Sequence, residues 1–403
     1  MRSAFPFRPP AVELRPGLAL GLELAFGPVG VSFPAPPECD PNGVFEAART
    51  MALAARIAAR WPREALVEGL GSEVAGSFFM ALRRTGVAEL QAEAVAEHIA
   101  RLGADLGLPV LFLKGAALLL EGLVLPGSRG LGDVDVLTPE GRQQELQDRL
   151  KAEGCYEPQD LPSGEHQLQV LGHPLGLAVE VHLCIRGVRN PSGDSFTWTD
   201  VDESGAYDSV SRFDGDARTP TSDLLLAHAV VHGLAHHGLN PKSYPMLRFV
   251  ADIIDLDLAG AVESGSYERW MPWVERDVSR REVEALAEMC RRLTGGESTA
   301  RFWPGNDDAA LMLRHLVLGA VDIEYRDSLR IRSLASVMPS RGRSATLLRT
   351  LWGATVLTRG QVDALYGKPS SSWGYWGYRL YRPFDLIGRI VRYGVAAIKG
   401  WRR

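Results

Sequence analysis

One segment, LFLKGAALLLEGLVLPGSRGLGDVDVL at residues 111–137, constrains the fold most strongly. It begins as an apolar run, turns at Lys114 and Gly115 into a helical pattern, crosses a glycine-rich loop and ends in an alternating stretch. Side chains two residues apart on a strand project from the same face, so Asp133 and Asp135 lie side by side while the intervening valines enter a core. Two carboxylates that close, and partly buried, repel each other unless a cation lies between them.

A later alternating stretch, GLAVEVHLCI at residues 176–185, carries a third acidic side chain. Glu180 and His182 share one of its faces, so this strand would bring three carboxylates together if it lay beside the aspartate strand. Carboxylates around hard cations such as Mg²⁺ or Mn²⁺ are what in-line phosphoryl or nucleotidyl transfer requires. The Lys114–Gly115 turn adds backbone N–H groups and a positive charge that can hold a phosphate. Taken singly, each motif also has a purely structural explanation. The acidic residues could lie at a solvated strand end, and the Lys114–Gly115 turn could be an ordinary helix start.

The patterns around these motifs predict an α+β protein with an α/β core. Short strands at 109–113, 133–137 and 176–185 alternate with helical patterns, which indicates a small mixed sheet flanked by helices. The chain therefore divides into an irregular proline- and glycine-rich arm over 1–45, an N-terminal helical region over 46–108, the core over 109–216, and a helical domain over 217–403 with a basic, aromatic tail.

Composition narrows the class of protein further. A hydrophobic content of 46% and a charged content of 23% over 403 residues are ordinary for a folded protein of more than one domain. The net charge of -5 gives no indication of a nucleic-acid partner. The four cysteines are scattered, and no segment supplies the roughly 20 uninterrupted apolar residues of a membrane span. We therefore expect a soluble, cytoplasmic protein without a transmembrane segment.

Together these motifs resemble the uncharacterised nucleotidyltransferase family of the DNA polymerase β superfamily. LKG, RGLGDVDVL and VEVHL follow one another in the order and with the residue types typical of that family. The resemblance implies Mg²⁺ or Mn²⁺ as cofactor and a nucleoside triphosphate as substrate. Its implied site residues are the catalytic, metal-binding acids Asp133, Asp135 and Glu180, with Lys114, Gly115 and Arg129 at the nucleotide.

The helices that follow the core extend this resemblance. LLLAHAVVHGLAHHG and LRFVADIIDL are similar to the helical segment behind the family's core, whose histidines and arginine–aspartate helix face the cleft. The candidates for the acceptor side or the cleft are His182, His232, His236, Arg248 and Asp252. His228, His232 and His236 recur every four residues, yet the chain has no H-E-x-x-H motif.

The function expected from these observations is Mg²⁺-dependent transfer of a nucleoside monophosphate to a hydroxyl or phosphate acceptor, with release of pyrophosphate. The acceptor is a peptide, a small molecule or RNA. Two alternatives stay open: a non-catalytic nucleotide- or partner-binding protein on the same fold, and a metal-dependent hydrolase that uses the histidine helix. The basic tail is either a packed helix or a contact for a membrane surface or an acidic partner.

Overall fold

The computed structural model describes residues 9, 11–30, 39–158, 166–213, 215–237, 246–322, 325, 374–384 and 388, except the side chains of 236, 237 and 246. The chain divides into two compact units. The first covers residues 1–157 and 163–321, and the second covers 158–162 and 322–403. Every residue of the candidate site described below belongs to the first unit. The finer division into arm, helical regions and core remains a prediction.

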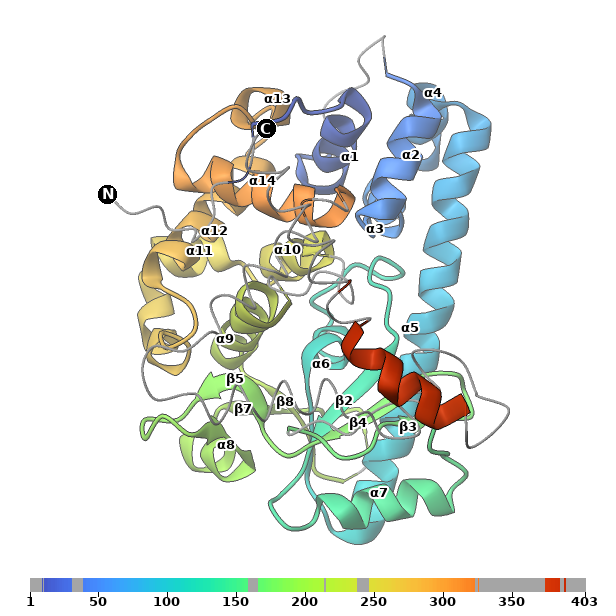
Figure 1. Ribbon diagram of the computed structural model, residues 1–403, viewed down its shortest axis with the longest axis vertical. Helices are drawn as coiled ribbons and strands as arrows, with labels where there is room; N and C mark the ends of the chain where they lie inside the picture. Colours follow the sequence, from blue (N-terminus) through green and yellow to red (C-terminus); the bar gives the residue numbers. More distant parts are fainter. Residues whose placement is uncertain are drawn as a thin grey trace. The chain divides into compact units, whose positions relative to one another are not determined.

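A mixed β-sheet lies within the first unit (Figure 1). Among the described residues it has six strands in the order β3-β4-β2-β1-β8-β7. Strand β2 is antiparallel to β1 and parallel to β4, and β1 is parallel to β8. The strands are β1 (Val110–Phe112), β2 (Asp133–Leu137), β3 (Leu171–Gly172), β4 (Ala178–His182), β7 (Tyr207–Ser209) and β8 (Ala217–Pro220). The α+β class predicted from the alternating segments is confirmed.

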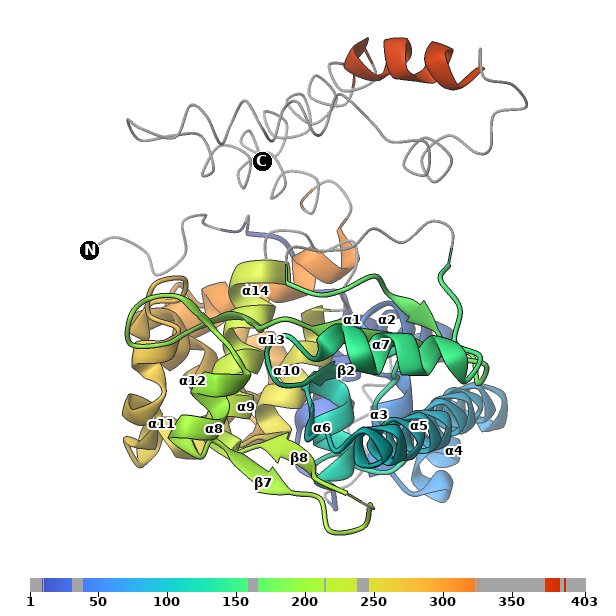
Figure 2. The same ribbon diagram turned by 90° about the horizontal axis from the view of Figure 1, so that it is seen from below.

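One face of this sheet packs against two helices, α5 (Ser72–Leu106) and α7 (Gln143–Ala152). Figure 2 shows both helices close to β2, and they also pack against each other. Val134 and Val136 are fully buried in the core that these elements share. Because side chains alternate along a strand, the aspartates of β2 project from the opposite face.

That opposite face carries α6 (Lys114–Leu120), α9 (Ser222–Val231) and α10 (Met246–Asp255). A π-helical segment, η1 (His232–His237), continues α9. Helices α9 and α10 lie side by side beyond the sheet (Figure 1). This arrangement places the expected acidic strands and the expected histidine and arginine helices around one space.

The remaining described elements of the first unit complete its frame. A small second sheet joins β5 (Ile185–Arg189) to β6 (Ser195–Phe196). Besides α1, which is described next, the other α-helices are α2 (Pro41–Thr50), α3 (Ala54–Arg60), α4 (Arg63–Leu70), α8 (Trp198–Ser204), α11 (Leu258–Glu263), α12 (Arg280–Thr294), α13 (Thr299–Phe302) and α14 (Asp308–Val321). Two short 3₁₀ helices, η2 (Ser266–Arg269) and η3 (Met271–Trp273), lie between α11 and α12. None of the helices in the described ranges combines the length and apolar character needed to cross a membrane.

Helix α1 (Pro16–Phe26) lies inside the segment that we expected to be irregular. Pro16 occupies its first turn, where the missing N–H is tolerated. Leu20, Leu22 and Leu24 are at most 1% exposed, because α2, α3 and α13 surround the helix. Glu23 is the only charged residue of this largely buried helix, so the helix has no polar stripe and hydrophobic periodicity could not reveal it.

Candidate active site

Strands β2 and β4 bring the predicted acidic side chains together. Asp135 and Glu180 are direct partners in the parallel register, and Asp133 lies two residues earlier on the same face of β2. Asp135 is buried at 2% exposure, whereas the side chain of Glu180 is 19% exposed. Strands β2 and β4 are therefore neighbours, and the three carboxylates meet as predicted.

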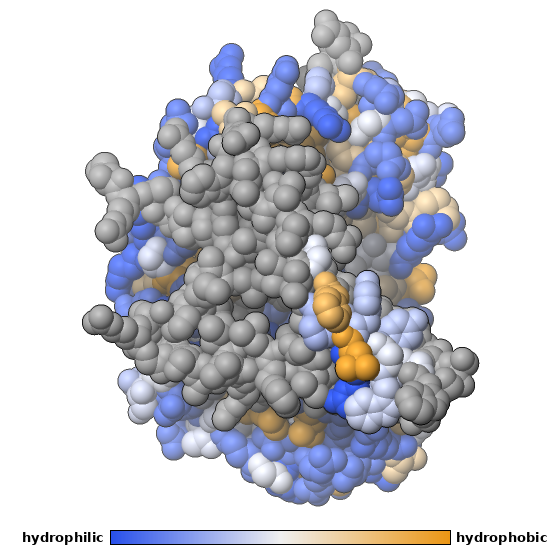
Figure 3. All heavy atoms as spheres, in the orientation of Figure 1, coloured by the Kyte–Doolittle hydropathy of each residue, from blue (hydrophilic) through white to orange (hydrophobic). Residues whose placement is uncertain are grey.

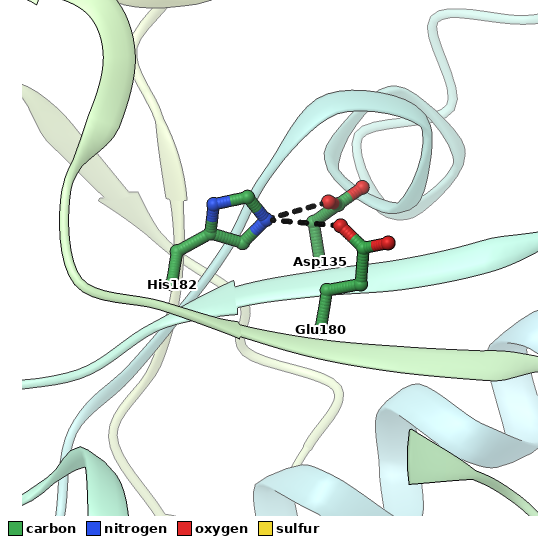
Figure 4. Close-up of side chains that lie close together, drawn as sticks. All are labelled: Asp135, Glu180 and His182. Atoms are coloured by element: carbon green, nitrogen blue, oxygen red, sulfur yellow. Dashed lines mark hydrogen bonds and ion pairs between the residues drawn. The ribbon is translucent and has the colours of Figure 1, made fainter. Parts of the chain in front are cut away.

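The imidazole of His182 lies next to two of these carboxylates (Figure 4). Its Nε2 atom is 2.7 Å from Oδ1 of Asp135 and 3.6 Å from Oε2 of Glu180. Ligand atoms of Asp135, Glu180 and His182 lie within 4.8 Å of one another, close enough to surround one metal ion. This trio shares Asp135 and Glu180 with the predicted set, but it has the His182 imidazole nitrogen in place of a carboxylate oxygen of Asp133.

Lys114 directs a positive charge into the same cluster. It follows β1 with a φ of 50°, a left-handed conformation that is uncommon for a residue with a side chain. Its Nζ atom is 2.5 Å from Oδ1 of Asp135, and the backbone N–H of Leu113 donates to the carbonyl oxygen of Asp135 at 2.9 Å. Such a conformation costs about 1–3 kcal/mol and is concentrated at functional sites.

Burial and mutual charge shift the protonation of the cluster. Burial opposes the charge of Asp135, but the Lys114 ammonium and the hydrogen bond with His182 hold its pKa well below the ordinary value. Burial alone would lower the pKa of Lys114, but the carboxylates of Asp135, Asp133 and Glu180 outweigh it and raise that pKa. The neighbouring charge of Asp135, followed by burial, raises the pKa of Asp133. Repulsion between the carboxylates of Asp133 and Asp135 therefore persists beside the lysine, and a cation placed between them would relieve it.

Gly115 allows a guanidinium group to lie directly against the strand-to-helix turn. A Cβ atom at this position would be 1.9 Å from Nη1 of Arg129 and 2.5 Å from Cδ2 of Leu131. Arg129 cannot easily yield, because its Nε and Nη2 atoms contact the two oxygens of Asp252 at 2.8 and 3.0 Å. The arginine expected at the triphosphate is therefore bound to Asp252 and supports the turn.

The Gly115→Ala substitution should destabilise the protein by about 1–3 kcal/mol, because the added methyl group collides with a fixed side chain. It should also weaken nucleotide binding by displacing the turn. Urea unfolding and calorimetric nucleotide titration measure the two effects. Gly130→Ala is the matched control, since a Cβ at Gly130 meets nothing within 4 Å. Equal behaviour of the two variants would contradict the steric argument.

Glu89 was not identified from the sequence as part of this region. It lies on α5 at 5% exposure, and its carboxylate accepts the backbone N–H groups of Gly127 at 2.5 Å and Arg129 at 2.9 Å. The loop before β2 is thereby fixed to α5. The sequence did contain a signal for its burial: Glu89 lies three and seven residues before Ala92 and Ala96, on the buried face of the helix. A buried carboxylate requires hydrogen-bond donors such as a loop backbone.

A cavity of about 330 Å³ opens above the acidic cluster. Besides the predicted residues it is lined by His166, by Arg186 of β5 and by His228 of α9, which were not predicted as part of the nucleotide site. Burial and the nearby charge of Arg186 lower the pKa of His166 to about 4, so its imidazole is neutral at pH 7. The predicted residues on the cavity wall are Lys114, Gly115, Arg129, Asp133, Asp135, Glu180, His232, Arg248 and Asp252.

The histidine helix contributes to the cavity wall. His228 is 4% exposed, and its ring centroid is 5.6 Å from that of His232. The side chain of His236 lies outside the described part of the structure. Nη1 of Arg248 donates to the carbonyl oxygen of Gly130 at 2.8 Å, which joins α10 to the loop before β2. These positions agree with cleft-lining roles, which remain predictions.

The site combines paired acids on one strand of a mixed sheet, a third acid on the parallel neighbouring strand, and a lysine–glycine turn beside them, as the sequence motifs predict. The sequence model of a family described as "Uncharacterised nucleotidyltransferase" matches residues 37–293, and the chain belongs to this family. Comparison with curated proteins and with solved structures gave no match. Family membership supports a general role in nucleotidyl transfer.

Proposed function

We propose that the protein transfers a nucleoside monophosphate from a nucleoside triphosphate to a hydroxyl or phosphate acceptor and releases pyrophosphate. The observation that carries this proposal is the register of β2 and β4, which pairs Asp135 with Glu180 and keeps Asp133 on the same face. The Lys114 ammonium at 2.5 Å from Asp135 adds a phosphate-binding group at the cluster.

The donor atoms of the cluster fit a divalent cation. Asp133, Asp135 and Glu180 offer the carboxylate oxygens that Mg²⁺ and Mn²⁺ prefer. A bound divalent cation would offset charge on the triphosphate and favour the ionised form of an attacking hydroxyl. The close approach of three carboxylates on neighbouring strands supports this assignment, because a divalent cation would relieve their mutual repulsion.

The protein's own residues then have distinct roles in the transfer. The acceptor oxygen attacks the α-phosphorus, the bond from that phosphorus to the oxygen bridging to the β-phosphate breaks, and pyrophosphate leaves. Glu180, the more exposed partner of the Asp135–Glu180 pair, accepts the proton of the acceptor hydroxyl. Lys114 and the backbone N–H of Gly115 hold the triphosphate, while Arg129 keeps the turn in place through its contact with Asp252.

His182 acts as a positioning residue for Asp135. Its Nε2 atom and the Lys114 Nζ atom both contact Oδ1 of this carboxylate, which fixes the orientation of the group. Arg186, His232 and Arg248 also line the cavity and offer hydrogen-bond donors to the acceptor. These groups are compatible with a peptide, a small molecule or RNA.

Release of pyrophosphate in the presence of an acceptor pool tests the proposal. The purified protein is incubated with each nucleoside triphosphate, Mg²⁺ or Mn²⁺, and a cell extract. We expect release that depends on the extract and is lost in Asp133→Ala and Asp135→Ala. Nucleotide binding without release would instead indicate a non-catalytic binding protein. Activity that requires Zn²⁺ and His232 but not Asp133 would indicate a hydrolase.

The Lys114→Met substitution should separate nucleotide binding from metal binding. We expect nucleotide affinity to fall by roughly tenfold to a hundredfold, since a charge-assisted phosphate contact contributes about 1.5–3 kcal/mol. Mn²⁺ binding without nucleotide should become tighter, because the competing ammonium 2.5 Å from Asp135 is removed. Calorimetry measures the first quantity, and titration of free Mn²⁺ by electron paramagnetic resonance measures the second.

Lys151→Met is the control for this prediction. Lys151 lies on α7, is 34% exposed and pairs with Glu157 away from the cavity. Its replacement should leave both affinities unchanged. Weaker Mn²⁺ binding in Lys114→Met than in the unmodified protein would show that the ammonium does not compete with a cation at Asp135.

A further inference from the structure

The described helix of the second unit, residues 374–384, exposes one apolar face. Trp376, Leu380 and Phe384 follow at intervals of four residues, which places them along the same side of a helix. Their exposures are 55%, 73% and 70%, values unusual for large apolar side chains on one surface. Figure 3 shows hydrophobic side chains on the surface of this helix, which Figure 1 draws in red.

Positive charge accompanies this apolar face. The guanidinium of Arg379 lies 5.2 Å from the ring centroid of Trp376 and 5.4 Å from that of Tyr375. In the sequence, residues 374–403 contain seven arginine and lysine residues against a single acidic residue, Asp385, in a chain whose net charge is -5. Basic charge is therefore concentrated in this part of the chain.

We infer that the Trp376–Leu380–Phe384 face binds the surface of an anionic lipid bilayer. Tryptophan and tyrosine rings have an apolar body and a polar edge, and arginine can extend its charged end toward lipid headgroups. Helices that lie in the bilayer interface combine such residues with basic charge. The described residues 374–384 include two arginines, Arg379 and Arg382, which do not suit the apolar interior of a membrane span, so the helix would lie along the surface.

An acidic protein partner explains this face less well. A protein groove would need to cover Trp376, Leu380 and Phe384 with complementary shape, whereas a bilayer accepts any continuous apolar strip. The seven basic residues against one acidic residue over 374–403 match the diffuse negative charge of anionic lipids. The inference is independent of the nucleotidyl-transfer reaction.

Co-sedimentation of the full-length protein with vesicles tests this inference. One set of vesicles contains phosphatidylcholine alone, and the other contains phosphatidylcholine mixed with phosphatidylglycerol. We expect binding to the mixed vesicles that weakens as salt is raised, and little binding to phosphatidylcholine. The triple variant Trp376→Ser, Leu380→Ser, Phe384→Ser should reduce the partition coefficient at least tenfold. The three apolar side chains favour binding by moving from water into the bilayer, and serine removes this contribution.

A matched control changes apolar residues of similar exposure elsewhere. Val87 and Leu90 on α5 are 57% and 68% exposed, so Val87→Ser with Leu90→Ser removes exposed apolar area without touching the second unit. This control should bind vesicles as the unmodified protein does. Equal loss in the two variants would overturn the inference, as would equal binding to both kinds of vesicle. Binding to soluble polyglutamate but not to vesicles would also overturn it.

A second measurement covers the case in which the triple variant does not fold. Lipids with brominated acyl chains quench tryptophan fluorescence at short range. The single substitution Trp376→Phe keeps an aromatic ring on the helix and should remove part of this quenching in anionic vesicles. Unchanged quenching in Trp376→Phe would show that this face does not enter the bilayer.

Discussion

Asp135→Asn should lower the rate of nucleotidyl transfer by about a thousandfold while the fold is retained. Asp135 is the carboxylate on which the cluster converges, since Lys114, His182 and the register partner Glu180 all lie against it. Asparagine has nearly the same shape but no charge, so it can hold neither a divalent cation nor the lysine as strongly. A thousandfold loss corresponds to about 4 kcal/mol of transition-state stabilisation, within the range that a metal site supplies.

Steady-state rates of pyrophosphate release measure this effect, and circular dichroism verifies the fold. Asp208→Asn is the matched control, because Asp208 lies on β7 of the same sheet but is exposed and away from the cavity. Its activity should equal that of the unmodified protein. If Asp135→Asn retained a rate within tenfold of the unmodified protein, the acidic cluster would not be the catalytic site.

Asp252→Ala should lower the free energy of unfolding by about 3–5 kcal/mol. Asp252 and Arg129 are 5% and 7% exposed and form a two-point ion pair between α10 and the loop before β2. Removing the carboxylate leaves the guanidinium buried without that charge partner, which is the costly way to break a buried pair. The same helix also binds Arg56 of α3 through Asp255 at 2.7 Å, so α10 joins the N-terminal helices to the core.

Urea denaturation of three variants separates charge burial from lost packing. The double variant Arg129→Met with Asp252→Leu should recover most of the stability, because it removes both charges and fills the space. Asp308→Ala breaks the exposed Arg281–Asp308 pair, at 43% and 27% side-chain exposure, and should cost at most about 1 kcal/mol. Equal losses in Asp252→Ala and Asp308→Ala would contradict the proposed role of α10.

Alternation along two short segments predicted the centre of the site. In β2 it placed Asp133 and Asp135 on one face, and in β4 it placed Glu180 and His182 on one face. The period of two fixes such faces regardless of the rest of the fold. Whether the two strands would be neighbours could not be derived from alternation, and the family resemblance supported that step.

The parts that escaped prediction depend on long-range packing. The Arg129–Asp252 pair joins residues 123 positions apart, and nothing local to either residue identifies the other. Arg186 was not predicted as a cavity residue, because its place there depends on how β5 folds back against α9. Glu89 belongs to an ordinary amphipathic helix pattern. Its function of fixing the loop before β2 becomes visible only from its hydrogen bonds to the backbone of Gly127 and Arg129.

The position of the transferred phosphorus tests the central claim most directly. The purified protein is given nucleoside triphosphate labelled either at the α- or at the γ-phosphorus, with Mg²⁺ or Mn²⁺ and an acceptor pool. We predict that the α-label enters the acceptor and the γ-label leaves in pyrophosphate. Transfer of the α-label and release of labelled pyrophosphate should both be abolished in Asp133→Ala and Asp135→Ala. Entry of the γ-label into the acceptor, or α-label transfer that persists in both aspartate variants, would contradict this account.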